Sequence, residues 1–140
     1  MENLKLNEAC REQAVATRKK GFINDHIPTL LMLIVSELSE ALEADRKDRH
    51  ADIKAFEKDL PVVYTAHGCY PQMSESVEDA AKVFKEHFEK HIKDSFEDEI
   101  ADAFLRLMDL CGRWDIDIEK HIRLKAAYNQ LRPIKHGKKY

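Results

Sequence analysis

The chain has 140 residues, of which 44% are hydrophobic and 35% are charged, and its formal net charge is −3. Its length predicts one domain over residues 1–140 that is long enough to bury a core. Polymeric DNA or RNA is not an expected partner, because no basic stripe or aromatic-interleaved basic patch is present.

Helical signals dominate the chain, which has only four glycines and four prolines. A first helix is expected over about residues 3–20, because Gly21 suits a C-terminal cap. A second helix is expected to begin near Pro28, a residue that suits a first helical position, and to end near Lys47. A shorter polar helix over residues 51–59 is expected to follow.

The stretch LPVVYTAHGCYPQMS, at residues 60–74, carries the clearest non-helical signals, because Pro and Gly punctuate it and VVYT favours β structure. We expect a loop, a short hairpin or a lid there. A helix capped by Ser74 or Ser76 is then expected to reach about His91.

Ser95 is expected to cap the next helix, with Asp98 in a position resembling that of a capping box. That helix should reach about Arg113, and Asp115 or Asp117 should cap a last helix that ends at about residues 132–133. The expected fold is therefore all-α: a bundle of four or five main helices, with a loop-rich insertion at about residues 48–94, completed by oligomerisation.

Two acidic pairs interrupt the two most apolar helices. Glu37 and Glu40 lie within LLMLIVSELSEAL, and Glu99 and Asp102 lie within EIADAFLRLMDLC. At about 100° per residue, both pairs border the apolar stripes of their helices. The expected stripes are Leu30, Ile34, Leu38 and Ala41 in the first helix, and Phe96, Ile100, Ala103, Phe104, Leu107 and Leu110 in the second.

The context of these pairs matters more than their spacing. Glu-x-x-Glu/Asp occurs five times in the chain, and in the polar contexts that start at Glu75 and Glu86 it indicates a solvated helix face. Carboxylates that border a core are costly unless a cation balances them. Two such helices packed together would bring four carboxylates to one place, which predicts a site for a hard cation, Mg²⁺ or Mn²⁺.

In the last helix, Lys125 and Asn129 are four residues apart and so point the same way. An ammonium and an amide that face the bundle would suit a phosphate oxygen. The alternative is a lysine whose stem runs along the edge of the core.

The order of these motifs resembles the all-α nucleoside triphosphate pyrophosphohydrolases of the MazG type. The resemblance rests on Glu-x-x-Glu in IVSELSEALEADR, then Glu-x-x-Asp, then Lys-x-x-x-Asn, Arg-Pro and a His-Gly-Lys tail. It covers about residues 21–47 and 95–140. Fifty-eight residues separate Glu40 from Glu99, whereas the simplest members of that family keep the two motifs much closer together.

The resemblance implies a Mg²⁺-dependent enzyme, with Mn²⁺ as a substitute, that cleaves a nucleoside triphosphate into nucleoside monophosphate and pyrophosphate. Glu37, Glu40, Glu99 and Asp102 would be the catalytic metal ligands, and Glu40 is our first choice to activate the attacking water. Contacts to the phosphates are implied for Lys125, Asn129 and, in the tail, Lys138. A homodimer or homotetramer is also implied.

Cation-assisted chemistry is consistent with the rest of the sequence, because no Gly-x-x-x-x-Gly-Lys loop is present to hold a triphosphate with backbone amides. A di-iron carboxylate bundle is excluded, since such sites use Glu-x-x-His and the chain has none. The remaining alternative is a non-enzymatic helical adaptor or regulator, in which the acidic pairs only form salt bridges with Arg106 or Lys125.

Other features favour structural roles. His87 and His91 have a metal-capable spacing, but no His-Glu-x-x-His occurs, so a surface helix face is favoured over a zinc site. The three cysteines fit neither a disulfide framework nor a zinc knuckle. The apolar run at residues 30–35 is too short to span a bilayer, and the N-terminus lacks a signal-peptide core, so no membrane association and a cytoplasmic location are expected.

Overall fold

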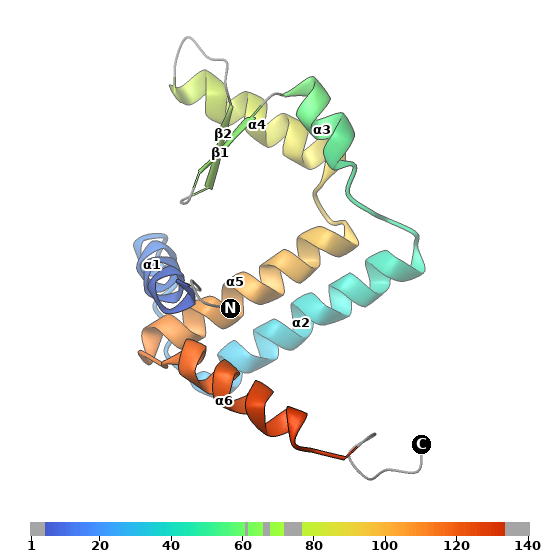
Figure 1. The fold of residues 1–140 in the computed structure, drawn as a ribbon. Coiled ribbons are helices and arrows are strands. Elements are labelled where there is room, and N and C mark those ends of the chain that lie inside the picture. Colours follow the sequence, from blue (N-terminus) through green and yellow to red (C-terminus); the bar gives the residue numbers. More distant parts are fainter. Residues whose placement is uncertain (1–4, 61, 66–67, 72–76, 134–140) are drawn as a thin grey trace. The chain divides into compact units, whose positions relative to one another are not determined.

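The computed structural model of the chain describes residues 5–60, 62–65, 68–71 and 77–133. Within these residues the chain forms six helices and one two-stranded antiparallel hairpin (Figure 1). The elements are α1 (Leu6–Lys19), α2 (Ile27–Arg46), α3 (Ile53–Asp59), β1 (Val62–Thr65), β2 (Gly68–Pro71), α4 (Val77–His91), α5 (Phe96–Arg113) and α6 (Ile118–Gln130). None of the described helices is long and apolar enough to cross a bilayer. The prediction of a predominantly helical fold is confirmed.

The capping signals of the sequence define the helix ends. Gly21 follows α1 with φ of +90°, a conformation that glycine adopts without strain. The Ser95 hydroxyl accepts a hydrogen bond from the Asp98 N–H at 3.2 Å at the start of α5. Asp117, rather than Asp115, caps α6, and its carboxylate accepts from the Lys120 N–H. These three predicted helix ends match the structure within two residues.

The segment between the two acidic motifs is more regular than the predicted loop-rich insertion. It contains α3, the β1–β2 hairpin and α4. The hairpin pairs Val62 with Pro71 and Thr65 with Gly68, so of the three conformations considered for residues 60–74 the hairpin is the one found. The serines considered as caps of α4 lie outside the described residues.

The chain divides into two compact units, and each is described by itself. The terminal unit is Met1–Met32 with Leu105–Tyr140, and the central unit is Leu33–Phe104. Both α2 and α5 contribute residues to each unit. The two acidic motifs lie wholly within the central unit.

In the central unit, α3 packs on α4 through aromatic side chains. Phe56 of α3 is buried, and its ring meets the ring of Phe84 edge-on, with centroids 5.7 Å apart. Phe84 in turn stacks on Phe88 one turn along α4. These contacts explain why a helix as short as α3 is stable, because packing rather than intrinsic propensity holds short helices.

Hydrogen bonds join the segment that follows α2 to the segment that precedes α5. The Phe96 N–H donates to the Arg49 carbonyl at 2.9 Å, and the Asp52 N–H donates to the His91 carbonyl at 2.9 Å. The Glu97 carboxylate adds a bond from the Ala51 N–H at 2.8 Å. The end of α2 and the start of α5 are therefore held together, so the two helices run in opposite directions (Figure 1).

In the terminal unit, reciprocal hydrogen bonds join the start of α1 to the start of α6. The Asn7 N–H donates to the Glu119 carboxylate at 2.9 Å, and the Asn7 side-chain oxygen accepts from the Glu119 N–H at 3.2 Å. The Asn7 amide also donates to Asp117 at 2.8 Å. Two helix N-termini thereby satisfy part of their unpaired backbone donors.

The end of α5 lies close to α1. A Cβ added at Gly112 would overlap the backbone oxygen of Cys10, so glycine permits the close approach of α1 to α5. Next to it, the Arg113 guanidinium donates to both oxygens of Asp109 and also bonds Asp25 and the carbonyls of Phe22 and Asn24. This fully buried guanidinium ties α5 to the residues before α2.

The predicted apolar stripes are wrong in part. The inward line of α2 runs through Leu30, Ile34, Glu37, Ala41 and Ala44, and Leu38 is 48% exposed. On α5, Ala103 and Leu110 are buried as predicted, whereas Phe104 and Leu107 are exposed. The most buried apolar positions of α2 and of mid-α5 are the alanines Ala41, Ala44 and Ala103, which let helices approach closely, whereas larger apolar residues beside them are exposed.

Candidate metal centre

The first acidic pair occupies two different environments on α2. Glu37 lies on the inward line of the helix and is only 6% exposed. Glu40, one turn later, is exposed and accepts a long hydrogen bond from the Ser36 hydroxyl at 3.4 Å. Glu37 is therefore deeper than the sequence predicted, and Glu40 lies at the rim.

The second pair shows the same division on α5. Glu99 is 7% exposed, and it lies one turn after the capping residue Ser95, whose carbonyl accepts the Glu99 N–H at 3.1 Å. Asp102 is exposed. Because Ser95 fixes where α5 begins, it also fixes the position of Glu99 on the inward face.

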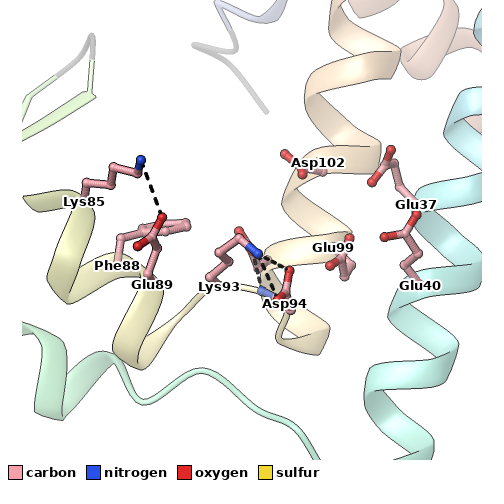
Figure 2. A pocket seen from close by; sticks show the side chains of 10 residues that line it. Glu37, Glu40, Lys85, Phe88, Glu89, Lys93, Asp94, Glu99 and Asp102 are labelled. Carbon is pink, nitrogen blue, oxygen red and sulfur yellow. Dashed lines mark hydrogen bonds and ion pairs between the residues drawn. The ribbon is translucent and has the colours of Figure 1, made fainter.

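Glu37, Glu40 and Glu99 form one cluster. Each offers a carboxylate oxygen, and these three oxygens all lie within 4.8 Å of one another. Figure 2 shows Glu37 and Glu40 of α2 pointing toward Glu99 of α5. Asp102 lies outside this close group but lines the same pocket. Thus both predicted motifs contribute to one site, with three of the four predicted ligands in direct proximity.

Carboxylates of like charge lie close together in this cluster, and they affect one another's ionisation. Burial raises the pKa of Glu99 above its usual value, and the charges of Glu40, Asp98 and Glu37 raise it further. Burial likewise raises the pKa of Asp98, although a hydrogen bond from the Asp94 N–H opposes this effect. Among the described residues, no lysine or arginine forms an ion pair with Glu40, Glu99 or Asp102. A divalent cation would relieve this repulsion.

The carboxylates line a pocket of about 430 Å³ whose other wall belongs to α4. Lys85, Phe88 and Glu89 come from α4, and Lys93 follows directly after it (Figure 2). The Lys93 ammonium pairs with Asp94 at 2.8 Å, and that of Lys85 approaches Glu89 at 3.8 Å. The sequence prediction missed these residues, because they lie in the stretch interpreted as a solvated helix face.

A signal for this wall was present in the sequence. Lys85, Phe88 and Glu89 are spaced i, i+3 and i+4, which places them on one helix face. The spacing does not reveal that α4 lines the same pocket as the acidic motifs. That information comes from the hydrogen bonds at residues 49–52 and 91–97.

The predicted phosphate-binding residues are not part of this cluster. Lys125 and Asn129 lie on α6 in the terminal unit, and both are exposed in the single chain. In the single chain the Lys125 ammonium lies over the ring of Tyr128, 5.1 Å from its centroid. Lys138 lies outside the described residues.

Comparison of the chain with protein-family models, with curated proteins and with solved structures gave no match. Functional inference therefore rests on the residues of the site.

Proposed function

We propose that this protein is a divalent-cation-dependent hydrolase that cleaves a nucleoside triphosphate to the nucleoside monophosphate and pyrophosphate. The observation that carries the proposal is the cluster of Glu37, Glu40 and Glu99, whose oxygens lie within 4.8 Å of one another. Two of these three carboxylates are buried, and buried charges in proteins are paired or coordinate a metal ion.

The donor set fits Mg²⁺ or Mn²⁺. All donors are carboxylate oxygens, the ligands that hard cations prefer. Around an octahedral Mg²⁺ with bonds of 2.0–2.1 Å, ligand oxygens are about 2.9 to 4.2 Å apart, so small side-chain rotations would bring the three carboxylates to suitable positions. Asp102, which lines the same pocket, would be the fourth ligand. The bound cation would neutralise the triphosphate and act as a Lewis acid during its cleavage.

The exposure of the residues suggests a division of roles. Glu37 and Glu99 are buried and anchor the site, whereas Glu40 is exposed at the rim, where solvent has access. We assign Glu40 to orient and deprotonate the attacking water, a role that requires contact with solvent. On the opposite wall, the ammonium groups of Lys85 and Lys93 would bind phosphate oxygens.

The proposed contacts of Lys125, Asn129 and Lys138 with phosphate depend on the family resemblance alone. In the adaptor alternative, the acidic pairs would only form salt bridges, and bound Mg²⁺ and nucleotide would not stabilise the protein. Removal of non-standard nucleotides from the cellular pool would be a suitable role for such an enzyme.

We further propose that the chain works as a homodimer or homotetramer. On α2, Leu31, Val35, Leu38 and Leu42 are each 47% to 50% exposed. They are spaced by four, three and four residues, the repeat by which helices associate. Exposed apolar stripes of this kind indicate interaction surfaces, and a second copy of α2 is a partner with a matching stripe.

A turnover assay tests the proposed activity. Pyrophosphate release is measured with Mg²⁺ for a panel of canonical and modified nucleoside triphosphates, using the wild-type chain and E40Q. We expect E40Q to lose about 10²-fold or more of turnover, the usual contribution of a general base, while nucleotide affinity is retained. If metal and nucleotide affinity collapse as well, Glu40 is a ligand only.

The matched control is E43Q. Glu43 lies three residues further along α2 and carries the same charge, but it pairs with Lys47 at 2.9 Å and lies outside the cluster. E43Q should retain wild-type turnover. Absence of pyrophosphate release from every triphosphate, together with a melting temperature unaffected by Mg²⁺ and nucleotide, would contradict the proposal and favour an adaptor.

A further inference from the structure

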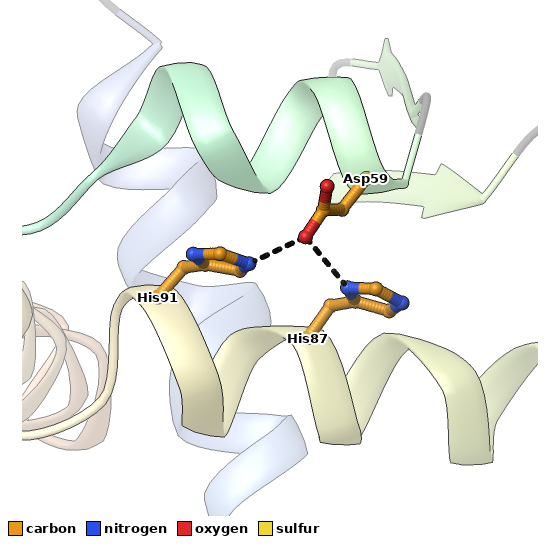
Figure 3. Close-up of side chains that lie close together, drawn as sticks. All are labelled: Asp59, His87 and His91. Carbon is orange, nitrogen blue, oxygen red and sulfur yellow. Dashed lines mark hydrogen bonds and ion pairs between the residues drawn. The ribbon is translucent and has the colours of Figure 1, made fainter.

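A second cluster of metal-ligating side chains lies in the central unit between α3 and α4. It consists of Asp59 at the end of α3 and of His87 and His91 on α4 (Figure 3). One ligand atom of each residue lies within 4.8 Å of the other two. The His91 Nε2 is 2.9 Å and the His87 Nδ1 is 3.9 Å from the same carboxylate oxygen, Oδ2 of Asp59. None of these residues belongs to the acidic cluster.

The two imidazole rings are arranged in parallel. Their centroids are 6.2 Å apart and their planes differ by 7°, as expected for side chains one turn apart on a helix. Figure 3 shows both rings directed at the Asp59 carboxylate. The aromatic packing of Phe56 on Phe84 holds α3 against α4, so the carboxylate is presented to the histidine pair by the fold itself.

His87 carries a buried nitrogen without a partner. Its Nδ1 is inaccessible to solvent and has no hydrogen-bond partner among the described residues, although it faces the Asp59 carboxylate. Buried polar atoms are nearly always satisfied, and an exception calls for an explanation such as a bound ion. A metal ion between the three side chains would satisfy this nitrogen.

We propose that Asp59, His87 and His91 bind one Zn²⁺ ion. Two imidazoles and a carboxylate are a ligand set that zinc favours, with a water in the fourth position. Bonds of 2.0–2.2 Å in a tetrahedral site separate the ligand atoms by about 3.3 Å, and the distances of 2.9 and 3.9 Å lie on either side of this value. Small rotations of the imidazole rings therefore suffice.

The sequence alone favoured a surface helix face here, because it did not reveal a third ligand. Asp59 lies 28 positions before His87 in the sequence, and only the packing of α3 on α4 brings the carboxylate to the histidines. The carboxylate is ionised over the whole neutral range, since hydrogen bonds from Lys90 and His91 lower the pKa of Asp59 to about 2. The Lys90 ammonium, 62% exposed and 2.9 Å from Oδ2, would have to move into solvent when zinc binds.

Bound zinc would fasten α3 to α4 and thereby fix the helix that carries Lys85 and Phe88. Imidazole donors suit zinc and carboxylate donors suit Mg²⁺, so the two clusters should take different ions. The zinc proposal does not depend on the proposed hydrolase activity.

Zinc binding to the full-length chain, stripped with EDTA, tests the proposal. Zn²⁺ binding is measured by titration calorimetry in the E99Q variant, in which binding at the acidic cluster is weakened. The absorption spectrum of bound Co²⁺ identifies the type of donor atoms. We expect one ion per chain. D59N and H87Q should each weaken affinity by at least about tenfold, since loss even of groups that merely orient ligands costs 10-fold to 100-fold.

H121Q is the matched control, because His121 is exposed on α6 and is not a member of the cluster. Helix content measured by circular dichroism separates loss of a zinc ligand from loss of the fold. If H87Q does not fold, the test depends on D59N. The proposal is overturned if the E99Q chain binds no zinc, or if D59N and H87Q bind it as tightly as H121Q does.

Discussion

Replacing Glu99 with glutamine should stabilise the protein when divalent cations are absent, the opposite of the usual effect of changing a buried residue. Glu99 is 7% exposed, and oxygens of Glu37 and Glu40 lie within 4.8 Å of one of its own. At that separation, two unit charges repel by about 3.5 kcal/mol at an effective dielectric constant of 20, and by about 0.9 kcal/mol in water. E99Q removes this repulsion while nearly preserving the volume of the side chain.

We therefore expect E99Q to raise the free energy of unfolding in EDTA at neutral pH by about 1–3 kcal/mol. Burial and neighbouring carboxylates raise the pKa of Glu99 above its ordinary value of 4.5, so its ionisation destabilises the folded state. This cost appears as the pH rises through the folded-state pKa and is fully present above it. The gain from E99Q should consequently vanish at pH values below about 4.5, where the unfolded carboxyl is also protonated.

Addition of Mg²⁺ should reduce the difference in stability between the two proteins. The wild-type chain should gain about 1.4 kcal/mol at a Mg²⁺ concentration ten times the dissociation constant, and E99Q should gain much less. Urea unfolding with and without Mg²⁺ measures both effects, and E43Q controls for the loss of one negative charge on α2. If E99Q is less stable than E43Q in EDTA, or gains as much from Mg²⁺ as wild type, the carboxylates do not form a repulsive cation site.

Three further predictions concern other parts of the molecule. Hydrogen bonds from Lys90 and His91 lower the pKa of Asp59 to about 2. The contribution of Asp59 to stability is therefore present above its unfolded pKa and is lost as the pH falls from about 4 to about 2. Acid titration of metal-free D59N, followed by circular dichroism, should lack this loss of stability. G112A should destabilise the protein by about 1–3 kcal/mol in urea unfolding, because the added Cβ meets the rigid backbone oxygen of Cys10. An unchanged urea midpoint of unfolding would show that α1 can move away from α5. The double variant L38E/L42E should lower the molecular mass measured by light scattering while helix content is retained, since it places charges on the exposed stripe of α2; an unchanged oligomer would locate the interface elsewhere.

Local sequence signals predicted the helices because the signals and the structures they describe are close together in the chain. Gly21, Ser95 and Asp117 each act on backbone groups within a few residues, so their effects can be inferred without knowledge of the fold. The same holds for the pairing of Glu37 with Glu40 on one helix. What these signals define is the start of a helix and its phase along the chain.

Long-range neighbours could not be predicted in this way. The sequence placed Leu38 in the core because it is large and apolar, whereas α2 in fact turns the line of Glu37, Ala41 and Ala44 inward. A helical wheel predicts the buried face of a helix from hydrophobicity. It therefore predicts the wrong face for a helix that buries small residues and carboxylates. Lys85 and Phe88 were missed for a related reason: their position in the pocket depends on hydrogen bonds between residues 39 and 47 positions apart.

The backbone hydrogen bonds from Phe96 to Arg49 and from Asp52 to His91 also bear on how this architecture can diversify. They bring the two ends of the α3, hairpin and α4 segment to neighbouring points, so a brief turn would be enough to connect α2 directly to α5. The intervening residues can thus be gained, lost or exchanged as a cassette, with little disturbance to the carboxylates on either side. Variation in this cassette would change which molecules reach the pocket while the helices that carry Glu37, Glu40 and Glu99 stay the same.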